Sequence, residues 1–452
     1  MTLRFGTDGI RGEAGADLTP ELVLALGRAA AAVIGAPGVP FVVGRDTRWS
    51  GPMLHAALAA GLTASGFDVV DLGVVPTPAV AAAALALGAP AAVISASHNP
   101  YADNGIKLLS AGGRKLTDEQ EDAVEAVLAG HQVGPTASGD HIGRLRTDPG
   151  LEGRYIGAVV AALAGRRLDG IRVVIDCANG AATHTAPAIL DAAGADVVEV
   201  LADQPDGRNI NAGCGSTDPS GVSAAVIRHR ADAGLAFDGD ADRVIAVDEN
   251  GDVVDGDRLL ALFAGDLAER GLADGGGVAV TVMTNLGFHR AMAAAGVPVT
   301  TTPVGDRHVL AAMEERSWPV GGEQSGHIIF RGLFADLAPT GDGVLTGLLL
   351  LDLVRRRQQR LSVLAGEAMV RLPQVLLNVR VADHSALGAA QAVWQEVAAV
   401  EGALGDQGRV LLRPSGTEPL VRVMVEAPTE ADARRAADRL AGAVVAALGR
   451  PA

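Results

Sequence analysis

The alternation of short apolar runs with helix-like segments constrains the fold of this chain most. Strand-like runs at 41–46, 68–72 and 91–95 are separated by helix-like segments at 53–65 and 76–87. This alternation is typical of an α/β domain with a largely parallel sheet. Ligands of such sheets bind beyond the carboxyl ends of the strands. Residues at those ends, such as Arg45 and Ser97, are therefore the first candidates for a functional site.

The same pattern recurs along the chain. Strand-like runs follow at 171–176, 196–200 and 234–237, and then at 278–283 and 299–303. The last part has strand-like runs at 376–381 and around 410–423, with helix-like segments at 385–400 and 429–448. A chain of 452 residues is too long for one core. We expect four domains, at 1–150, 151–253, 254–368 and 369–452.

The charge and composition exclude several classes of protein. A net charge of −16 and an aromatic content of 3% disfavour nucleic-acid binding. Neither apolar stretch that we considered, 79–94 and 344–354, forms a convincing membrane span, and no signal-like apolar region follows the N-terminus. Two cysteines, Cys177 and Cys214, do not make a disulfide framework. We therefore expect a cytoplasmic protein without nucleic-acid or membrane partners.

Lysine is almost missing from this chain. Lys107 and Lys115 are the only lysines among 37 basic residues. Lysine can release its proton when its pKa is depressed, whereas arginine effectively cannot. A bias toward arginine would therefore leave lysine where arginine cannot replace it, which makes Lys107 a candidate proton carrier and Lys115 a weaker one. The alternative is that the two lysines survive by chance.

The stretch from Ser95 to Pro100 ends a buried strand with turn and capping residues. Ser97, His98 and Lys107 lie within eleven positions of one another. A serine, an imidazole and a lysine at a strand end are the ingredients of a phosphoryl- or acyl-transfer site. Taken alone, the stretch is equally well explained as a polar loop.

Three aspartates follow the strand-like run at 234–237. Asp238, Asp240 and Asp242 alternate along the chain, so their side chains point the same way in an extended segment. Such carboxylates repel one another unless a cation neutralises them, and oxygen ligands favour a hard cation. An EF-hand is excluded because Arg243 occupies the position that requires glycine and because a strand precedes the loop. The remaining alternative is a solvated acidic turn.

Two later loops are typical of sugar and phosphate binding. The stretch 321–327 holds Glu323, Ser325 and His327 between glycines, and such a mixture of donors and acceptors suits sugar hydroxyls. The stretch 413–419 joins two strand-like runs, where backbone amides can form an anion nest and arginines can bind phosphate. Its candidate phosphate ligands are Arg413, Ser415, Gly416, Thr417 and Arg422. Together these features indicate phosphoryl chemistry on a phosphorylated, hydroxyl-rich substrate.

Six motifs in this order resemble those of the α-D-phosphohexomutase family. They are GTDGIRG at 6–12, ISASHNP at 94–100, NGIK at 104–107, DGDADR at 238–243, GEQSGH at 322–327 and RPSGTEP at 413–419. Gln324 and the stretch NAGCGSTD at 211–218 favour the branch of the family that acts on glucosamine phosphates. The resemblance implies three similar mixed-sheet α/β domains and a smaller α+β C-terminal domain around a central cleft.

The resemblance also implies a mechanism. Ser97 would be a phosphoserine, and Mg²⁺ would be held by Asp238, Asp240, Asp242 and a phosphoserine oxygen. Phosphate would pass to the sugar, and a bound bisphosphate, glucosamine 1,6-bisphosphate or glucose 1,6-bisphosphate, would turn and return its other phosphate. The product would feed amino-sugar nucleotide and cell-wall precursor synthesis.

The other implied roles belong to three groups of residues. Arg11, His98, Lys107, Arg243 and His327 would line the reacting end, with Lys107 the first candidate for acid–base work and His98 the second. Gly305, Asp306, Glu323 and Ser325 would bind the sugar. The candidate phosphate ligands between Arg413 and Arg422 would bind the distant phosphate. The partner would be a small phosphosugar, and a homodimer is compatible with the family. The alternatives are a phosphomannomutase/phosphoglucomutase, a metal-dependent phosphatase with a serine nucleophile, and a non-catalytic sugar-phosphate binding protein.

Overall fold

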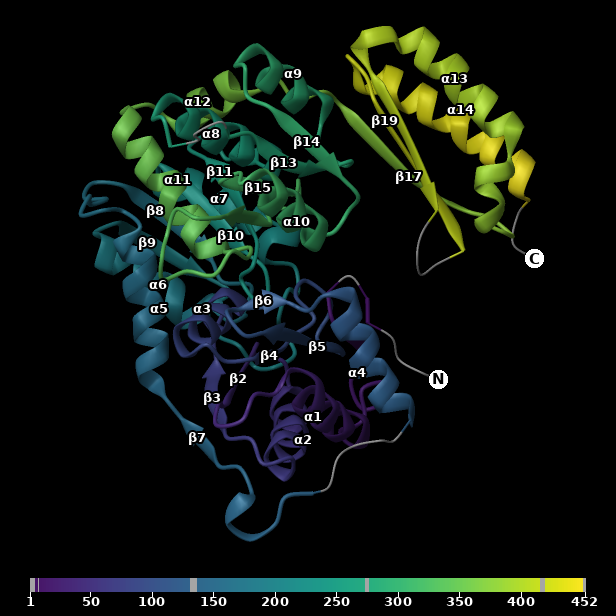
Figure 1. Cartoon of the computed structure of the whole chain (residues 1–452). Coiled ribbons are helices and arrows are strands. Elements are labelled where there is room, and N and C mark those ends of the chain that lie inside the picture. Colours follow the sequence, from purple (N-terminus) through teal and green to yellow (C-terminus); the bar gives the residue numbers. More distant parts are fainter. Residues whose placement is uncertain (1–4, 7, 131–135, 273–275, 415–418, 450–452) are drawn as a thin grey trace. The chain divides into compact units, whose positions relative to one another are not determined.

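The structure is a computed structural model that describes residues 5–6, 8–130, 136–272, 276–414 and 419–449. It divides into two compact units. The first comprises Met1–Met283 and Val297–Glu367, and the second comprises Thr284–Gly296 and Ala368–Ala452. Figure 1 labels their helices and strands. No helix among the described residues combines the length and the apolar character needed to cross a membrane.

The first sheet of the larger unit contains seven described strands in the order β1-β5-β4-β2-β3-β7, with β6 paired to β5. They are β1 (Ile10–Glu13), β2 (Phe41–Arg45), β3 (Val69–Val74), β4 (Ala91–Ile94), β5 (Asp103–Ser110), β6 (Arg114–Lys115) and β7 (Leu145–Thr147). The strands β4, β2, β3 and β7 are parallel, whereas β5 is antiparallel to both β4 and β1. The chain after Pro100 therefore runs back along β4 as strand β5, which the sequence pattern did not predict.

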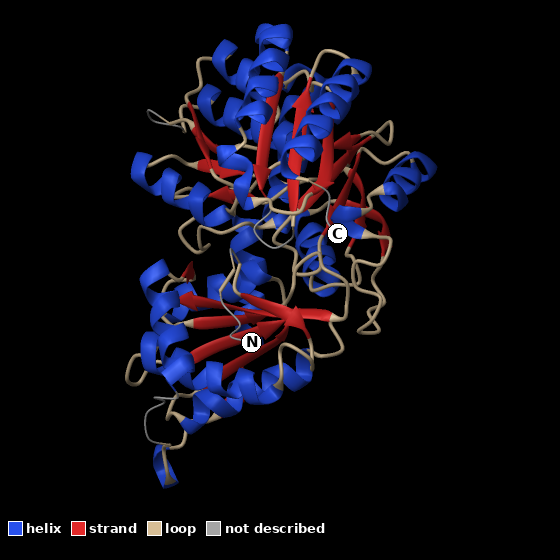
Figure 2. Cartoon of the chain, turned by 90° about the vertical axis from the view of Figure 1, so that its right-hand side faces the viewer, coloured by secondary structure: helices blue, strands red, loops and turns tan. Residues whose placement is uncertain are grey.

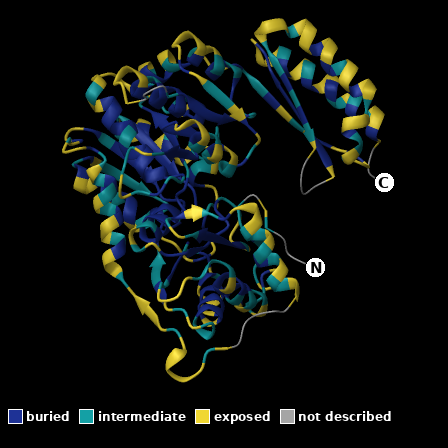
Figure 3. Ribbon diagram, in the orientation of Figure 1, coloured by how far each residue is buried: buried dark blue, intermediate teal, exposed yellow. Residues whose placement is uncertain are grey.

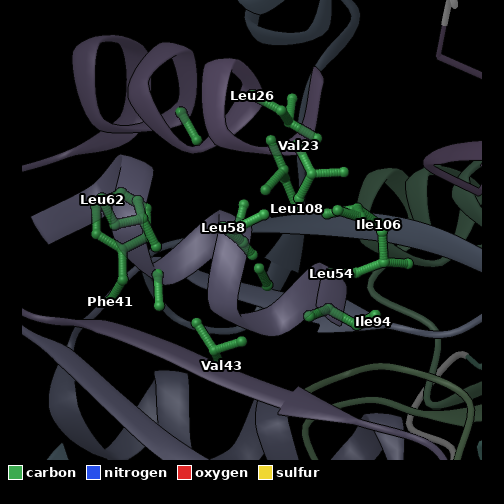
Figure 4. Packing of buried hydrophobic residues seen from close by; sticks show 14 of the residues in the cluster. Val23, Leu26, Phe41, Val43, Leu54, Leu58, Leu62, Ile94, Ile106 and Leu108 are labelled. Atoms are coloured by element: carbon green, nitrogen blue, oxygen red, sulfur yellow. The ribbon is translucent and has the colours of Figure 1, made fainter. Parts of the chain in front are cut away.

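Helices pack on both faces of this sheet. They are α1 (Pro20–Ile34), α2 (Gly51–Ala64), α3 (Thr77–Leu87) and α4 (Asp118–Gly130). The helices α1, α2 and α4 share an apolar cluster with one face of the sheet, which includes Leu54 and Leu58 of α2, Phe41 of β2 and Ile94 of β4 (Figure 4). On the other face α3 lies so close to β2 that a Cβ on Gly44 would be 2.5 Å from Val80. Residues 41–44 of β2 are therefore all buried, because alternate side chains face the helices on opposite sides of the sheet.

The second and third sheets repeat this arrangement with fewer strands. The second has the order β12-β11-β10-β8-β9 and the third the order β14-β13-β15-β16. The strands of the second are β8 (Arg172–Asp176), β9 (Asp196–Leu201), β10 (Ala233–Phe237), β11 (Val244–Asp248) and β12 (Val253–Val254). Those of the third are β13 (Val278–Thr281), β14 (Val299–Thr302), β15 (Val320–Gly322) and β16 (Ile328–Phe330). Each sheet is mixed, because antiparallel strands extend a parallel centre.

The helices of these sheets lie along their strands, as Figure 2 shows in blue and red. They are α5 (Pro149–Ala161), α6 (Ala182–Ala193), α7 (Ser220–His229), α8 (Gly256–Glu269), α10 (Asp306–Arg316), α11 (Gly343–Arg357) and α12 (Leu361–Ala368), with short 3₁₀ turns at Gly139–His141 and Gly215–Thr217. Helix α11 packs on β10 and β11 of the second sheet, where Gly347 lies against Leu235. It therefore joins the third region of the chain to the second.

The smaller unit is built on an antiparallel sheet in the order β17-β19-β18. Its elements are α9 (Leu286–Ala294), β17 (Gln374–Arg380), 3₁₀ turns at Ser385–Ala389 and Gly405–Gln407, α13 (Gln391–Leu404), β18 (Arg409–Pro414), β19 (Leu420–Glu426) and α14 (Glu430–Leu448). Helices α13 and α14 carry their buried residues toward the sheet and their exposed residues outward (Figure 3). The expected fold class, three mixed-sheet α/β regions and a smaller C-terminal one, is confirmed.

One predicted helix was wrong at its start. We expected a helix over 385–400, but 385–389 forms a 3₁₀ turn and α13 begins at Gln391. Ala390 between them has φ −78° and ψ 76°, which is outside the helical region. The indole N–H of Trp394 donates to the carbonyl oxygen of Leu387 at 2.9 Å and so ties the turn to the helix.

A buried carboxyl group caps α11. Asp342 Oδ1 accepts a hydrogen bond from the N–H of Leu345 at 2.9 Å, and the buried Tyr155 hydroxyl donates to both carboxyl oxygens at 3.1 Å. Burial raises the pKa of Asp342 to about 6, although these hydrogen bonds oppose the rise. At neutral pH these hydrogen bonds therefore compensate only part of the cost of burying the ionised carboxylate.

We expect Asp342→Asn to remove part of the pH dependence of stability. The folded-state pKa lies above that of an exposed aspartate, so the contribution of this carboxyl to stability is full below about pH 4 and is lost as pH rises through about 6. A shift of this size corresponds to about 3 kcal/mol. Urea unfolding at pH 4 and pH 7 should show the variant gaining stability relative to the wild type by up to that amount.

Tyr155→Phe is the matched control, because it removes the hydroxyl but keeps the carboxyl group buried. It should be less stable by about 1 kcal/mol and retain the pH dependence. If the wild type and Asp342→Asn have the same pH dependence between pH 4 and 7, the raised pKa is wrong.

Candidate active site

The turn after β4 holds Ser97 in a conformation that is unusual for serine. Ser97 is fully buried and has φ 53°, in the left-handed region that non-glycine residues seldom occupy. Its N–H donates to Ser95 Oγ at 2.9 Å, and Ser95 Oγ donates to Asp46 Oδ2 at 2.6 Å. Asp46 follows the neighbouring parallel strand β2, so two adjacent strand ends together position the serine.

A buried arginine holds the rest of this turn. The guanidinium of Arg48 donates to Asp46 Oδ2 at 2.9 Å and to the carbonyl oxygen of Ser97 at 2.9 Å. It also donates to the carbonyl oxygens of Asn99 at 2.8 Å, Asp103 at 2.9 Å and Pro100. These carbonyls converge because the chain curls around the guanidinium. The Arg48 side chain is thus the centre on which the turn is built.

The loop of three aspartates lies beside the serine, and Asp238 contacts it directly. Asp238 follows β10, and its Oδ2 accepts a hydrogen bond from Ser97 Oγ at 2.6 Å. Asp240 Oδ2 accepts from the hydroxyl of Thr77 at 2.6 Å. A Cβ on Gly239 would lie 2.6 Å from the carbonyl oxygen of Ser97, so only glycine allows the two turns to approach this closely. The serine turn of the first sheet and the aspartate turn of the second therefore form one site.

This aspartate cluster fits a divalent cation. All three residues are buried, and each offers a carboxylate oxygen within 4.8 Å of the others. Burial, with the neighbouring Asp242 and Asp240, raises the pKa of Asp238 well above its usual value. Within the described part of the chain, Asp240 Oδ1 and Asp242 Oδ1 are buried without a hydrogen-bond partner. Buried carboxylate oxygens in this state are suitable ligands for a hard cation.

Lys107 lies on β5 and points into the same cluster. Its Nζ is 2.7 Å from Asp240 Oδ2, 2.9 Å from Asp8 Oδ2 and 3.3 Å from Asp242 Oδ2. Burial alone would lower the pKa of Lys107, but the three carboxylates outweigh burial and hold it well above its usual value. We expected a depressed pKa from the scarcity of lysine. That reasoning was wrong in direction, because the sequence does not show which carboxylates surround the ammonium group.

His98 lies on the other side of Ser97. Its Nδ1 is 3.3 Å from Ser97 Oγ and 3.1 Å from Arg243 Nη1. Burial, together with the guanidinium groups of Arg243 and Arg11, lowers the pKa of His98 to about 4. The ring is therefore neutral at neutral pH. Since an arginine can only donate, we assign Nδ1 as the acceptor and place the ring proton on Nε2.

The third sheet brings residues from two loops to the same place. His327 lies with Nδ1 3.6 Å from Asp242 Oδ1 and Nε2 3.3 Å from Asp306 Oδ2. These carboxylates outweigh the effect of burial and raise the pKa of His327 to about 10. Glu323 Oε1 accepts from the N–H of Gly305 at 3.1 Å, which joins the two loops. Ser325, in the same loop as Glu323, is exposed.

The first loop of the chain and β6 complete this group with Asp8 and Lys115, two residues that sequence reasoning did not place there. Arg11 Nη2 lies 2.5 Å from Asp8 Oδ2. Lys115 Nζ lies 2.6 Å from Asp8 Oδ1 and 2.7 Å from Asp306 Oδ1. The scarcity of lysine had marked Lys115 as the weaker of two candidate proton carriers, whereas Asp8 lay unremarked inside the first motif.

The predicted phosphate ligands belong to the smaller unit. Arg413 on β18 and Arg422 on β19 are direct antiparallel partners, so their side chains share one face of the sheet. Ser415, Gly416 and Thr417 lie outside the described residues. The structure therefore brings together the predicted residues of the larger unit and, separately, the two arginines of the smaller unit.

Comparison with known proteins agrees with this organisation. Four regions match the four parts of one family, described as Phosphoglucomutase/phosphomannomutase. Residues 2–132 match its alpha/beta/alpha domain I, 154–251 domain II, 255–372 domain III and 376–443 its C-terminal domain.

Individual relatives match over nearly the whole chain. A protein of Frankia alni named phosphoglucosamine mutase is 54% identical, with all of both chains covered. One of Rhodococcus jostii with the same name is 52% identical over 97% of this chain and 98% of the relative. The crystal structure of a phosphoglucomutase/phosphomannomutase family protein from Burkholderia thailandensis superimposes with a TM-score of 0.81 at 28% identity, covering 98% of this chain and 97% of that one. The chain belongs to the phosphoglucomutase/phosphomannomutase family, the α-D-phosphohexomutases that its motifs resemble.

Proposed function

We propose that this protein is an isomerase that interconverts glucosamine 6-phosphate and glucosamine 1-phosphate through a phosphoserine at Ser97. The observation that carries the proposal is the 2.6 Å hydrogen bond from Ser97 Oγ to Asp238, inside a buried cluster of three carboxylates. Relatives that are 52% and 54% identical over nearly the whole chain are named phosphoglucosamine mutase, which supports glucosamine as the sugar.

We propose four domains with the boundaries 1–150, 151–253, 254–368 and 369–452. The support is that each of the four sheets takes most or all of its strands from one of these ranges. The first three ranges would supply the reacting end of the site and the fourth the distant phosphate grip. The protein would act in the cytoplasm on a small phosphosugar.

Asp238, Asp240 and Asp242 would hold Mg²⁺, together with an oxygen of the phosphorylated Ser97. When bound, the ion polarises the phosphoryl group and offsets developing negative charge. The chain's own contribution is to keep Ser97 and the three carboxylates in fixed positions, through the Arg48-centred turn and the close approach at Gly239. Such preorganisation is a large part of phosphoryl-transfer catalysis.

The phosphoryl group is exchanged between Ser97 and the sugar in two steps. A hydroxyl oxygen of the sugar phosphate attacks the phosphoryl group on Ser97, the bond from phosphorus to Ser97 Oγ breaks, and the hydroxyl proton passes to a base. The resulting glucosamine 1,6-bisphosphate turns round, and Ser97 Oγ attacks the phosphorus of its other phosphoryl group. The bond from that phosphorus to the sugar oxygen breaks, and the base returns the proton to this oxygen, which becomes the product hydroxyl. Either this bisphosphate or glucose 1,6-bisphosphate would activate an unphosphorylated enzyme.

The remaining site residues would bind the substrate. Arg11, Arg243 and His327 supply positive charge beside the carboxylate cluster. The residues that would bind sugar hydroxyls are Gly305, Asp306, Glu323 and Ser325. Those that would hold the distant phosphate are Arg413, Ser415, Gly416, Thr417 and Arg422. Donors and acceptors that serve both orientations of the sugar suit a reaction whose intermediate turns round.

The first test is a substrate panel with Mg²⁺ and a bisphosphate activator. We expect kcat/KM for glucosamine 6-phosphate to exceed that for glucose and mannose phosphates, with no steady release of inorganic phosphate. Intact-mass measurement should find one phosphoryl group, and peptide mapping should place it on Ser97. Higher kcat/KM for a glucose or mannose phosphate would contradict the glucosamine preference, and steady phosphate release would favour the phosphatase.

Ser97→Ala provides the control for this test. The variant should lack the phosphoryl group and have no measurable mutase activity, because the attacking and leaving oxygen is gone. Phosphate that persists in this variant would contradict the assignment of the nucleophile. A wild-type protein that binds sugar phosphate but carries no phosphate and shows no turnover would favour the non-catalytic alternative.

Asp240→Asn tests the cation site. The amide keeps the shape but removes one negative charge, so we expect weaker Mg²⁺ binding by calorimetry and a fall in kcat of roughly 10²-fold. Asp252→Asn, an exposed aspartate next to the same sheet, is the matched control and should behave like the wild type. Unchanged Mg²⁺ affinity in Asp240→Asn would exclude this carboxylate as a ligand.

We propose two side chains for acid–base work. We assign Lys107 the principal role, because its ammonium group points into the cluster. Its raised pKa makes it a proton donor rather than a base, and an arginine there could not release a proton. His98 is the second candidate, with Nδ1 3.3 Å from Ser97 Oγ.

Lys107→Arg is therefore expected to lower kcat by roughly 10²-fold, measured at saturating substrate. The guanidinium keeps its proton, and it is too bulky for a side chain that is only 4% exposed between three aspartates. His98→Gln, with an amide in place of the imidazole, should lose less. Normal turnover by Lys107→Arg would refute the acid–base role of this lysine.

A further inference from the structure

Six charged side chains of the larger unit form a closed ring in which cations and anions alternate. In order around the ring they are Asp242, Lys107, Asp8, Lys115, Asp306 and His327. The successive distances between charged atoms are 3.3, 2.9, 2.6, 2.7, 3.3 and 3.6 Å, the last closing the ring from His327 to Asp242. Each carboxylate therefore lies between two positive groups.

The ring is assembled from segments that are far apart in the chain. Asp8 precedes β1, Lys107 lies on β5 and Lys115 on β6. Asp306 opens α10, and His327 immediately precedes β16. The hairpin of β5 and β6 carries both lysines, but no local turn or helix brings the other residues to them, so the ring depends on the packing of the three sheets of the larger unit.

Lys115 occupies the side of the ring opposite Asp242. Its ammonium group bridges Asp8 Oδ1 and Asp306 Oδ1 at 2.6 and 2.7 Å, the two shortest contacts in the ring. Asp8 uses its second oxygen to hold Lys107, and Asp306 uses its second oxygen to approach His327. Lys115 is thus connected through Asp8 to Lys107 and through Asp306 to His327.

We propose that Lys115 and Asp8 are positioning residues for the reaction, and that they fix Lys107 and His327 against the aspartate cluster. The proposal rests on the proposed function, in which those two side chains line the reacting end. Lys107 contacts the carboxylates of Asp240, Asp242 and Asp8, and of these only Asp8 lies outside the aspartate loop. It gives Lys107 an anchor independent of that loop.

The physical reason is the repulsion that Lys115 cancels. Without its ammonium group, Asp8 would keep Lys107 and Arg11, and Asp306 would keep His327. The two carboxylates would nevertheless lose the cation between them in a partly buried site, where like charges interact strongly. Both carboxylates would move apart or turn toward other cations. Lys107 and His327 would then follow them, and small displacements of catalytic groups reduce turnover steeply.

The enzymatic test compares Lys115→Met with its neighbour Arg114→Met. Methionine keeps the length of the lysine stem without its charge, and we expect kcat to fall roughly 10-fold while KM changes less than about threefold. Lys115→Arg, which keeps the charge but not the compact shape of the ammonium group, should have a kcat between those of Lys115→Met and the wild type. Arg114 lies on the same strand as Lys115. Arg114→Met removes its exposed ion pair with Glu314 and should leave kcat unchanged.

A second measurement does not depend on activity. Because Lys107 and Lys115 are the only lysines, protein labelled with ¹⁵N-lysine contains two side-chain ammonium groups to observe by NMR. Lys115→Met should remove one signal and shift the other, since Lys107 is coupled to Lys115 through Asp8. Arg114→Met should shift neither signal appreciably.

The outcomes separate this proposal from the proposed function. A wild-type protein without mutase activity would refute the function, while the NMR comparison would still decide whether Lys115 positions Lys107. An unmoved Lys107 signal in Lys115→Met would overturn the proposal, as would equal losses of kcat in Lys115→Met and Arg114→Met. If Lys115→Met does not fold, Asp8→Asn is used in the same NMR comparison, and it should shift both lysine signals.

Discussion

Three buried carboxylates within reach of one another are the constraint on which the site depends. Asp238, Asp240 and Asp242 cannot all stay ionised away from water unless positive charge surrounds them. The protein supplies that charge from three directions, with Lys107 from the first sheet, Arg243 from the aspartate loop and His327 from the third sheet. The charge balance of one loop therefore requires contributions from three parts of the larger unit.

The same requirement explains why the serine turn is held so tightly. Ser97 must lie against Asp238 in a left-handed conformation that costs of order 1 kcal/mol or more. The buried Arg48 offsets this cost by donating to the carbonyl oxygens of Ser97 and Asn99, which also accept from the amide of Asn211, and Asp46 neutralises Arg48. Such polar networks are stabilising only when their members are satisfied. The strained residue and the buried ion pair are thus two parts of one arrangement.

Much of this arrangement could be predicted from the sequence. Strand ends were visible as apolar runs that stop at polar residues, so Ser97 and the three aspartates were found without a structure. Partners distant in sequence were not visible. Lys115 meets Asp306 across 191 residues, and no local pattern records such a pair. The direction of the pKa shift of Lys107 was missed for the same reason. The start of α13 was missed because Ala390, a good helix former, has a non-helical ψ angle here.

The scarcity of lysine has a different explanation from the one that first suggested itself. A depressed pKa is not what the two lysines share, because the pKa values of both are raised by neighbouring carboxylates. What they share is Asp8, whose two oxygens each take one ammonium group. A compact point charge can lie between two aspartates at once, whereas a planar guanidinium imposes its own fork geometry. In a chain that otherwise uses arginine, lysine remains at the two positions where a small cation must be shared among several carboxylates.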